Sequence, residues 1–445
     1  MIATQNGIAV RHGLMERVIE ARRQSDALFS LVRADCLYER PIPERHRIIF
    51  YVGHLEAFDW NLLREDLGLK SVQPELDRLF AFGIDPVGGG LPKDQSSDWP
   101  SLDQVHEYVS RVRAALDQKS ADEVFELRAP AQDGVSIETL LNVAVEHRLM
   151  HIETLAYMLH QLALDKKVRQ GRPPNLDNGP VVHRMVEVPT GRATLGLCRG
   201  SDDFGWDNEY EAHTVDVPAF AVDQHKVTNR QYLEFMDAGG YETRRFWNNS
   251  DADWNWKTAG GISHPVFWRK SGGHWLYRTM FDEVLLPLDW PVYVSHAEAS
   301  AYARWAGKSL PTEAEWHRAA YGAAGERERS YPWGSEAPNA MLGNFDFRGW
   351  DPTPVNAFPG SRSAFGVADM LGNGWEWTST VFAPFPSFEP FSFYRGYSAD
   401  FFDGKHFVLK GGSARTAACM LRPTFRNWFQ AHYQYAYTGF RCVSH

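Results

Sequence analysis

Cysteine is scarce in this sequence: four residues are spread over 445 positions, and none stands in a C-x-x-C spacing. Neither a disulfide framework nor a thiolate zinc site is indicated, and a reducing compartment fits. The sequence also lacks an apolar run of about 18 residues, and its N-terminal segment lacks the basic stretch and apolar core of a signal peptide. We therefore expect a cytoplasmic protein that does not cross a membrane.

Positive charge is scarce too. Lys and Arg number 46 against 56 Asp and Glu, which gives a formal net charge of -10, and no basic stripe is visible. Phosphate binding needs such a stripe, so a nucleic-acid partner is not expected. Aromatic residues, by contrast, reach 13% with 16 Trp, which suggests pockets with aromatic walls. The length predicts two or three domains of about 100 to 200 residues each.

The first part of the chain, from residue 8 to about 165, predicts helices, because apolar residues recur there at intervals of three and four positions. The expected helical segments are 15–32, 44–67, 101–118 and 135–163. Ser101 and Ser136 begin the last two and can cap them by accepting a backbone hydrogen bond. These segments predict a four-helix bundle, and the Gly- and Pro-rich stretch 82–100 is long enough to be a functional loop.

Two histidines, His147 and His151, stand four positions apart in the last predicted helix. Residues i and i+4 share a helix face, so both imidazoles can reach one point. Taken alone, such a pair is more often an ordinary surface or core feature. His54 on the second helix can add a third imidazole, which would leave positions open on an iron, zinc, copper or nickel ion, as in catalytic sites. Glu56 and Glu153 lie close in sequence as possible supporting carboxylates.

The segment 166–182 breaks the helical pattern with charge, Pro and Gly. We expect it to be a linker between a domain of residues 1–165 and a second domain of residues 183–445. After the linker the sequence changes to short β-type runs, frequent Gly and Trp-rich loops, for which little regular secondary structure is expected. The predicted fold class is therefore α+β.

Several runs of the second domain occur in a specific order. They are KVTNRQYLEF, WPVYVSHAEASAYARWAGKSLPTEAEWHRAA, YPWG, GVADMLGNGWEWTS, LKGGS and GFRCV. In order and spacing they resemble the formylglycine-generating-enzyme-like (sulfatase-modifying factor) domain, a compact variant of the C-type lectin fold, over nearly all of residues 183–445. A formylglycine generator itself is disfavoured, because that enzyme needs two reactive cysteines soon after GGS, and only Cys419 is offered here, at a different offset.

The first domain, with its three histidines, resembles a DinB-like bundle. This pairing of domains is similar to the ergothioneine sulfoxide synthase family, non-heme iron enzymes that use O2 to join a sulfur donor to C2 of the imidazole of hercynine (trimethylhistidine). The resemblance implies Fe(II) as the cofactor. In the family the iron is held by a histidine in a G-H or A-H motif of the second helix and by an H-x-x-x-H pair in the fourth, which here are His54, His147 and His151.

The run FRNW at residues 425–428 matches a family segment that lines the substrate pocket. The resemblance implies that Asn427 and Trp428 hold hercynine. Asn can hydrogen-bond a carboxylate or a ring, and Trp presents a π-face to a quaternary ammonium. The alternative is that the run only packs the lectin-like core.

The chain departs from the family directly after this run. Members that use γ-glutamylcysteine have an acidic residue after N-W and an arginine pair a few residues later, whereas this chain has Phe429 and, in place of an arginine, Tyr433. A dicarboxylate donor would lose its counter-charges here, and truncating a buried charged contact costs roughly 2 to 5 kcal/mol. That donor is therefore not expected.

A second departure concerns the tyrosine that family members place to supply a proton or an electron during sulfur oxidation. Phe385 stands where that tyrosine is expected and is predicted to line the substrate site. Tyr394 and Tyr397 are near in sequence and are the candidates to replace the tyrosine. The oxidation pathway can therefore differ in outcome from sulfoxide formation. One alternative is a thiol dioxygenase, which oxidises the donor without forming the bond to C2.

These departures favour a selenosugar donor, as in the selenoneine synthase branch, which has the same two-domain plan. A neutral, polyhydroxylated donor suits aromatic and polar walls, which Phe429, His432, Tyr433 and Tyr435 can offer. Cysteine or another thiol is the alternative donor. A lectin-like binding module beside a bundle that holds zinc or no metal is the alternative without catalysis.

Overall fold

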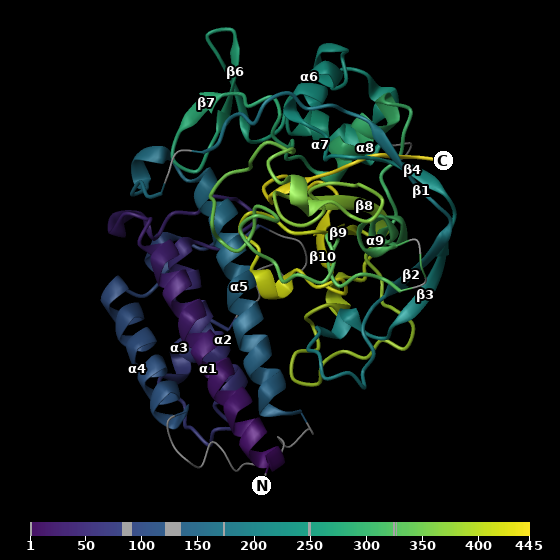
Figure 1. The fold of residues 1–445 in the computed structure, drawn as a ribbon. Coiled ribbons are helices and arrows are strands. Elements are labelled where there is room, and N and C mark those ends of the chain that lie inside the picture. Colours follow the sequence, from purple (N-terminus) through teal and green to yellow (C-terminus); the bar gives the residue numbers. More distant parts are fainter. Residues whose placement is uncertain are drawn as a thin grey trace. The chain divides into compact units, whose positions relative to one another are not determined.

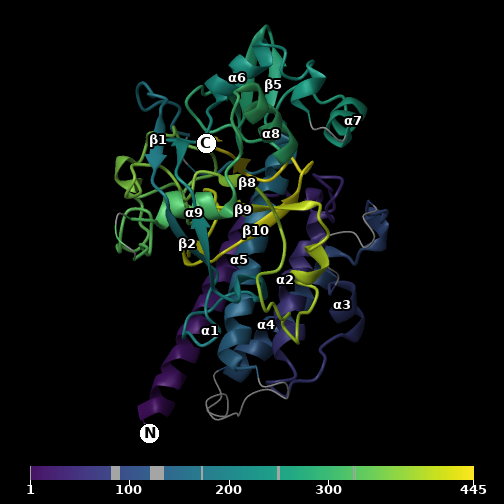
Figure 2. The same cartoon turned by 90° about the vertical axis from the view of Figure 1, so that its right-hand side faces the viewer.

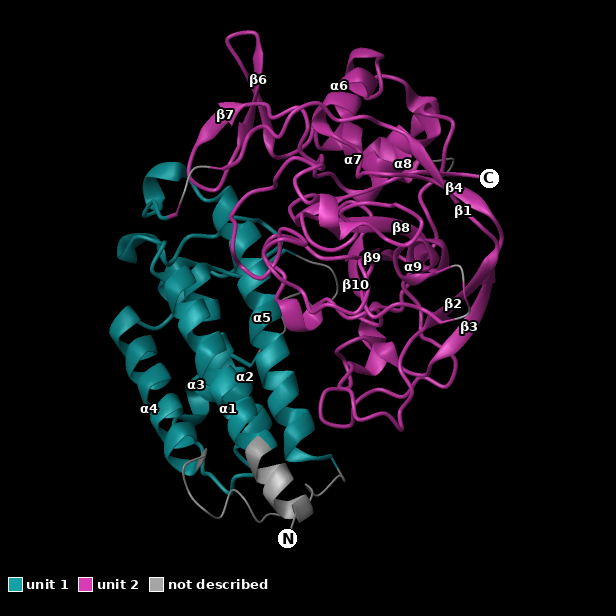
Figure 3. Cartoon of the chain, in the orientation of Figure 1, with its two compact units in different colours: residues 1–170 teal, residues 171–445 magenta. Residues whose placement is uncertain are grey.

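The computed structural model describes residues 2–81, 91–120, 135–171, 174–247, 251–323, 325 and 327–445. The chain divides into two compact units, residues 1–170 (unit 1) and residues 171–445 (unit 2), which Figure 3 shows in different colours. The boundary between them falls inside the segment predicted to be a linker. Residues 82–90, the first part of the loop predicted to be functional, lie outside the described residues.

Unit 1 consists of helices, most of which lie side by side along their lengths (Figure 1). They are α1 (Ile2–Phe29), α2 (Ile48–Leu63), α3 (Pro74–Leu79), α4 (Leu102–Ser120) and α5 (Ile137–Gln161). The four predicted helical segments are confirmed, although α1 begins well before its predicted start. The sequence pattern did not predict α3, because six residues are too few for an apolar period to show.

The predicted caps of the last two long helices are confirmed. The hydroxyl of Ser136 accepts a hydrogen bond from the backbone N–H of Thr139 at 3.2 Å, and that of Ser101 accepts one from Gln104 at 3.4 Å. Each bond satisfies an N–H group that the first turn of a helix leaves without a partner. Among the helices of the described residues, none is both long and apolar enough to cross a membrane.

Helices α2 and α5 form the interior of unit 1. Most residues of α2 are buried, and α5 is buried without interruption from His151 to His160. The histidines and most charged side chains of these two helices are therefore shielded from water. A polar group in such a place has to find a partner, because burying it alone is costly.

Unit 2 contains short strands in several small sheets. They are β1 (Met185–Val188), β2 (Gly191–Leu195), β3 (His213–Val217), β4 (Phe220–Asp223), β5 (Trp268–Ser271), β6 (His274–Arg278), β7 (Glu283–Leu285), β8 (Trp375–Val381), β9 (His406–Lys410), β10 (Asn427–Gln430), β11 (Thr438–Gly439) and β12 (Val443–Ser444). The sheet orders are β1-β4-β12, β2-β3, β5-β6-β7 and β10-β9-β8-β11. With the helical first unit, they confirm the α+β class.

Unit 2 also contains short helices that the sequence analysis did not predict, although most of its described residues lie in irregular segments, as expected. The helices are α6 (Asn229–Asp237), α7 (Ala252–Ala259), α8 (His296–Trp305) and α9 (Glu313–Tyr321). Three of them start with a capping box, formed by the pairs Thr228 and Gln231, Ser295 and Glu298, and Thr312 and Glu315. The S/T-x-x-E/Q pattern of such a box is readable in a sequence, so these helices could have been predicted.

The sheet of β8 to β11 carries Asn427, Trp428 and Phe429, three of the residues that sequence analysis assigned to substrate. β8, β9 and β10 lie side by side in Figure 2, and β10 pairs antiparallel with β9, so that Asn427 faces Leu409 and Phe429 faces Phe407. β10 is an edge strand of this sheet.

Candidate metal centre

Three histidine side chains converge in the core of unit 1. α2 contributes His54 and α5 contributes His147 and His151, and their ligand atoms lie within 4.8 Å of one another. The Nε2 atoms of His54 and His151 are 3.3 Å apart, and those of His151 and His147 are 3.1 Å apart. Each residue is only 4% exposed. The structure thus brings together the three histidines that the sequence singled out.

The spacing of these nitrogens fits one metal ion. On an ion with bonds of about 2.1 Å, two nitrogens are roughly 3.0 Å apart at right angles and roughly 3.4 Å apart at tetrahedral angles. The distances of 3.1 and 3.3 Å lie in this range. Three convergent nitrogens in a buried site are stabilised by a shared partner, which a metal ion would supply. Within the described part of the chain, no other group of three His, Cys, Asp or Glu side chains meets this spacing.

Burial keeps the three imidazoles neutral. It lowers the pKa of His54 to about 4, although the hydrogen bond to the Phe80 carbonyl works in the opposite direction. Burial also holds the pKa values of His147 and His151 well below their usual range, and the neighbouring positive charge of Arg148 adds to the effect. Neutral imidazole is the form that binds a transition metal, so no proton has to leave near neutral pH before a metal can bind.

Aromatic neighbours fix the planes of two of the ligand rings. Phe58 stacks on His147 with ring centroids 3.4 Å apart and an angle of 11° between the planes. Phe50 stacks on His54 at 4.7 Å and 21°. Both phenylalanines belong to α2, so this helix orients a ligand of its own and a ligand of α5.

The three ligands differ in their outer hydrogen bonds. Nδ1 of His54 donates to the carbonyl oxygen of Phe80 at 2.7 Å. The buried Nδ1 atoms of His147 and His151 have no hydrogen-bond partner among the residues that the structure describes. Metal-binding histidines usually donate a hydrogen bond from this second nitrogen to an acceptor. Of the three histidines, only His54 is oriented in this way by a residue that the structure describes.

A buried ionic network ties the two ligand helices together. Arg148 of α5 donates to Glu56 at 2.9 Å and to Asp59 at 2.6 Å, both on α2, and Arg113 of α4 donates to Glu56 at 2.7 Å. Burial alone would raise the pKa of Glu56, but Arg148, Arg113 and Arg22 together lower it to about 2. Glu56 therefore acts as an ionised link between helices.

Sequence analysis named Glu56 as a possible supporting carboxylate but missed Arg148, its buried partner. The signal was present, because a charged residue between His147 and His151, on a helix with a buried apolar face, needs a buried counter-charge. Glu153, the second carboxylate named from the sequence, is 8% exposed on α5.

Trp428 lies in a cluster of aromatic rings in unit 2. It stacks on Phe382 with centroids 4.2 Å apart and an angle of 8°, and Tyr397 meets it edge-on at 5.5 Å. Phe401 packs against it at 5.6 Å. The side-chain oxygen of Asn427 accepts a hydrogen bond from the backbone N–H of Trp428 at 2.8 Å, which fixes the amide beside the indole. Half-buried π-faces of this kind can receive a quaternary ammonium.

Arg426, in the same FRNW run, has a structural role. Its guanidinium binds Glu313 through two contacts of 3.0 and 3.2 Å, and both side chains are buried. The guanidinium carbon of Arg426 lies 3.9 Å from the centroid of the Phe385 ring, which also contacts the ring of His213. The core-packing alternative therefore holds for part of the run, and Phe385 contributes to that packing.

The two tyrosines considered as replacements for the family's tyrosine lie together. Tyr397 is buried and stacks on Trp206 at 4.0 Å, and Tyr394 lies 5.4 Å from Tyr397. Of the two, Tyr397 is the one with a ring contact to Trp428. The structure thus places one candidate beside the expected hercynine-binding indole.

The residues assigned to the donor form a second group. Phe429 and Tyr433 stack with centroids 4.8 Å apart and an angle of 6°, and Tyr435 meets Tyr433 edge-on at 5.7 Å. His432 bonds Asp253 of α7 at 2.8 Å. Successive side chains of a strand point to opposite faces, so Trp428 and Phe429 leave β10 on different sides.

Comparison with known proteins accounts for both units. The sulfatase-modifying factor enzyme 1-like domain family matches residues 173–445, and the DinB superfamily matches residues 17–155. The hercynine oxygenase of Mycolicibacterium thermoresistibile is 40% identical over 76% of this chain and 79% of its own length. The chain belongs to this ergothioneine sulfoxide synthase-like family. The resemblance seen in the sequence is confirmed, and the chain is an oxidative enzyme.

Other proteins are similar to different shares of the chain. The hercynine oxygenase of Mycolicibacterium smegmatis is 37% identical over 77% of this chain and 83% of its own length. Ergothioneine biosynthesis protein 1 of Neurospora crassa is 29% identical over 92% of this chain and 55% of its own length. Among solved structures, PvdO from Pseudomonas aeruginosa has a TM-score of 0.39 at 21% identity, covering 58% of this chain and 93% of that one.

Proposed function

We propose that this enzyme holds Fe(II) on His54, His147 and His151 and uses O2 to form a C–Se or C–S bond at C2 of the hercynine imidazole. The observation that carries the proposal is the set of three buried, neutral imidazoles with nitrogens 3.1 and 3.3 Å apart. The hercynine oxygenases among its relatives support the substrate. When bound, the iron would supply the redox chemistry that O2 requires.

The reaction balances with O2 as its only oxidant when the product is an oxide. Hercynine loses the hydrogen at C2, and the donor loses the hydrogen of its S–H or Se–H group. The new bond joins C2 to sulfur or selenium. One oxygen atom leaves with both hydrogens as water, and the other stays on the sulfur or selenium.

The side chains of unit 2 would bind and orient hercynine. We assign its trimethylammonium group to the π-face of Trp428 and its carboxylate to the amide of Asn427, which the Trp428 backbone holds in place. Tyr397 is our first candidate for donating a proton or an electron, because it contacts Trp428, and Tyr394 is the second. Phe385 has no proton to exchange.

We favour a selenosugar as the donor. At the positions where γ-glutamylcysteine would need charged partners, Phe429 and Tyr433 are uncharged and stack on each other. Their faces suit the apolar side of a sugar, and the neighbouring pair of His432 and Asp253 offers polar groups for hydroxyls. Cysteine or another thiol is the alternative donor, which would make the enzyme an ergothioneine sulfoxide synthase. Oxidation of the donor alone, as in a thiol dioxygenase, is the alternative reaction.

The test is a comparison of donors with anaerobically iron-loaded protein. Hercynine and O2 are supplied with selenosugar, thiosugar, cysteine or γ-glutamylcysteine in turn, and products are identified by mass. We expect C2-linked product with the selenosugar in the highest yield. Efficient turnover of γ-glutamylcysteine would overturn the donor assignment, and an oxidised donor without C2-linked product would favour the dioxygenase. If no donor leads to O2 consumption, the proposed function is wrong.

A further inference from the structure

A backbone carbonyl holds His54 from outside the trio. Phe80 directly follows α3, and its carbonyl oxygen lies 2.7 Å from Nδ1 of His54. The last carbonyls of a helix have no partner within the helix, so this oxygen is available as an acceptor. A carbonyl can only accept, so the proton lies on Nδ1 of His54. The lone pair is then on Nε2, which faces His151.

Gly53 allows Phe80 to approach α2 this closely. A Cβ atom at position 53 would lie 2.5 Å from carbon atoms of the Phe80 ring, well inside ordinary van der Waals contact. The ring of Phe80 is fully buried, so it has little freedom to turn away. A Gly in a helix interior is less stable than an Ala. Gly53 is nevertheless explained in α2, because the Phe80 ring occupies the space that an Ala Cβ atom would need.

The segment that carries Phe80 is anchored to two other helices. Asp77 of α3 accepts hydrogen bonds from the indole N–H of Trp60 on α2 at 3.3 Å and from the hydroxyl of Tyr108 on α4 at 2.9 Å. Trp99 stacks on the Phe80 ring at 6.2 Å and 21°. The carbonyl therefore has a fixed position relative to the bundle.

We propose that Gly53 and Phe80 are positioning residues that fix the tautomer and orientation of His54 and make it the anchored ligand of the trio. The unequal hydrogen bonding supports this, because in the described part of the chain the Nδ1 atoms of His147 and His151 have no such partner. Loss of an outer partner of a metal-binding histidine lowers metal affinity by about 10- to 100-fold. The effect on metal rests on the proposed function, whereas the hydrogen bond exists without metal and can be tested alone.

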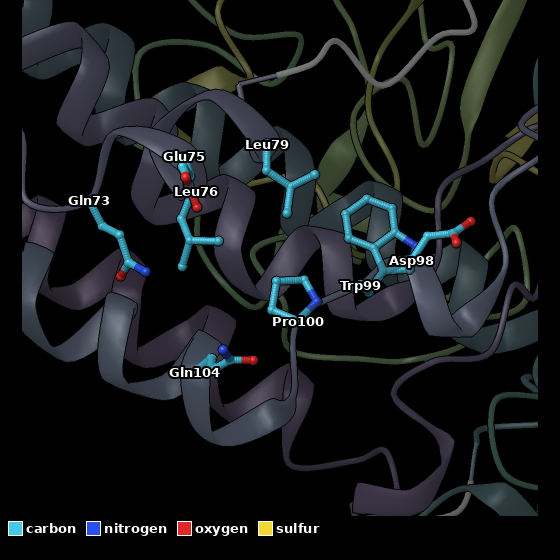
Figure 4. Close-up of a pocket in the computed structure, with 8 residues that line it drawn as sticks. All are labelled: Gln73, Glu75, Leu76, Leu79, Asp98, Trp99, Pro100 and Gln104. Carbon is cyan, nitrogen blue, oxygen red and sulfur yellow. The ribbon is translucent and has the colours of Figure 1, made fainter.

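One side of α3 borders a cavity. Its volume is about 470 Å³, and α3 contributes Glu75, Leu76 and Leu79 to its lining (Figure 4). The other lining residues are Gln73, Asp98, Trp99, Pro100 and Gln104. Because one side of α3 borders this space, a small shift of the Phe80 ring and its carbonyl in the variant need not unfold the bundle. We therefore expect Gly53→Ala to fold.

The experiment compares Gly53→Ala with Gly13→Ala in the full chain. Gly13 lies in α1, and a Cβ atom there would meet nothing within 4 Å, so this variant controls for the change from Gly to Ala in a helix. Nitrogen NMR of 15N-histidine-labelled protein without metal reports the His54 tautomer, with the signal assigned through His54→Gln. A competition titration with Fe(II) reports affinity. We expect mixed tautomers and about 10-fold weaker Fe(II) binding in Gly53→Ala, and no change in Gly13→Ala.

A second substitution provides a rescue. Gly53→Ala combined with Phe80→Leu removes the ring that a Cβ would meet, so we expect it to restore the single tautomer and most of the affinity. A folded Gly53→Ala with the wild-type tautomer and affinity would overturn the proposal. If Gly53→Ala does not fold, Asp77→Asn replaces it, and an unchanged tautomer there overturns the proposal equally. A tautomer shift in a protein whose wild type binds no Fe(II) would leave the positioning role intact and contradict the proposed function.

Discussion

Phe58 lies flat against the imidazole of His147, with ring centroids 3.4 Å apart and planes 11° from parallel. Phe58 and His54 are four positions apart on α2, so one face of this helix provides a ligand and also the ring that orients a ligand of α5. Nδ1 of His147 has no hydrogen-bond partner among the described residues. The stack therefore helps to hold the plane of this ligand, together with the contact to Nε2 of His151.

We expect Phe58→Leu to weaken Fe(II) binding by about 10-fold, comparable with the loss of an outer partner of a metal ligand. Leu keeps the site apolar but cannot hold the imidazole plane, so the loss of unfolding free energy should stay near 1 kcal/mol. A competition titration and a denaturant melt measure the two effects. Phe29→Leu, on a half-buried ring of α1, is the matched control. Unchanged affinity would mean that the α5 backbone alone orients His147.

His151→Ala should abolish iron loading while the chain stays folded. The Nε2 atom of His151 lies 3.3 Å from that of His54 and 3.1 Å from that of His147, so its removal takes away the nitrogen that adjoins both others. Two remaining imidazoles hold a divalent ion poorly. Iron analysis should give about one ion per chain for the wild type and none for the variant. His12→Ala, at an exposed position of α1, should load like the wild type. Iron retained by His151→Ala would show that His151 is not a metal ligand.

The sequence could predict the part of this site that depends on helical spacing. His147 and His151 share a face because α5 is regular, and the i,i+4 rule needs no tertiary structure. That His54 joins them depends on how α2 and α5 pack, which the bundle interpretation and the family resemblance suggested but the spacing alone could not. The Phe80 carbonyl could not be predicted, because any residue has a carbonyl and its position depends on a short, unpredicted helix.

For buried charges, the sequence predicts that a partner exists but does not identify it. Arg148 and Glu56 stand in segments with an apolar pattern, where a charged residue predicts a partner but not its identity. In unit 2 the helices α6, α8 and α9 were missed although their signal was present, because the capping boxes at Thr228, Ser295 and Thr312 can be read from the sequence. Short apolar runs between Gly and Trp suggested strands, and the helical signal was overlooked.

Glu56→Gln should destabilise the folded chain in a pH-dependent way. Glu56 is 1% exposed and bonds Arg148 and Arg113, so at neutral pH the loss of its charge should cost about 3 kcal/mol. Its pKa is lowered from 4.5 to about 2 by those arginines against the effect of burial. The folded chain thus binds this proton less readily than the unfolded chain, so the stabilisation is complete above pH 4.5 and is lost as the pH falls toward 2.

Denaturant melts at a series of pH values check this sign. The difference in unfolding free energy between wild type and Glu56→Gln should be constant near neutrality and shrink below pH 4.5. Glu20→Gln, at an exposed position of α1, is the control, because an exposed charge contributes little. A difference that grows toward acid pH would show that Glu56 is not held as an ionised link.

The donor assignment predicts a change of specificity. Phe429→Asp combined with Tyr433→Arg removes the stacked ring pair and introduces charges of the kind that γ-glutamylcysteine-using relatives carry. Restoring counter-charges to a dicarboxylate should be worth roughly 2 kcal/mol, which corresponds to about a 30-fold gain in kcat/KM for γ-glutamylcysteine. The selenosugar should lose rate, because its aromatic wall is gone.

The double variant Phe429→Leu and Tyr433→Phe separates the two parts of this argument. It removes the stacked pair of rings without adding charge, so it should lower the rate with the selenosugar and leave γ-glutamylcysteine unused. The ratio of kcat/KM for the two donors, measured with iron-loaded protein, should then rise toward γ-glutamylcysteine only in the charged variant. An equal ratio in both variants would mean that these positions do not contact the donor. The source of selectivity would then have to be sought beside Trp428 and Tyr397.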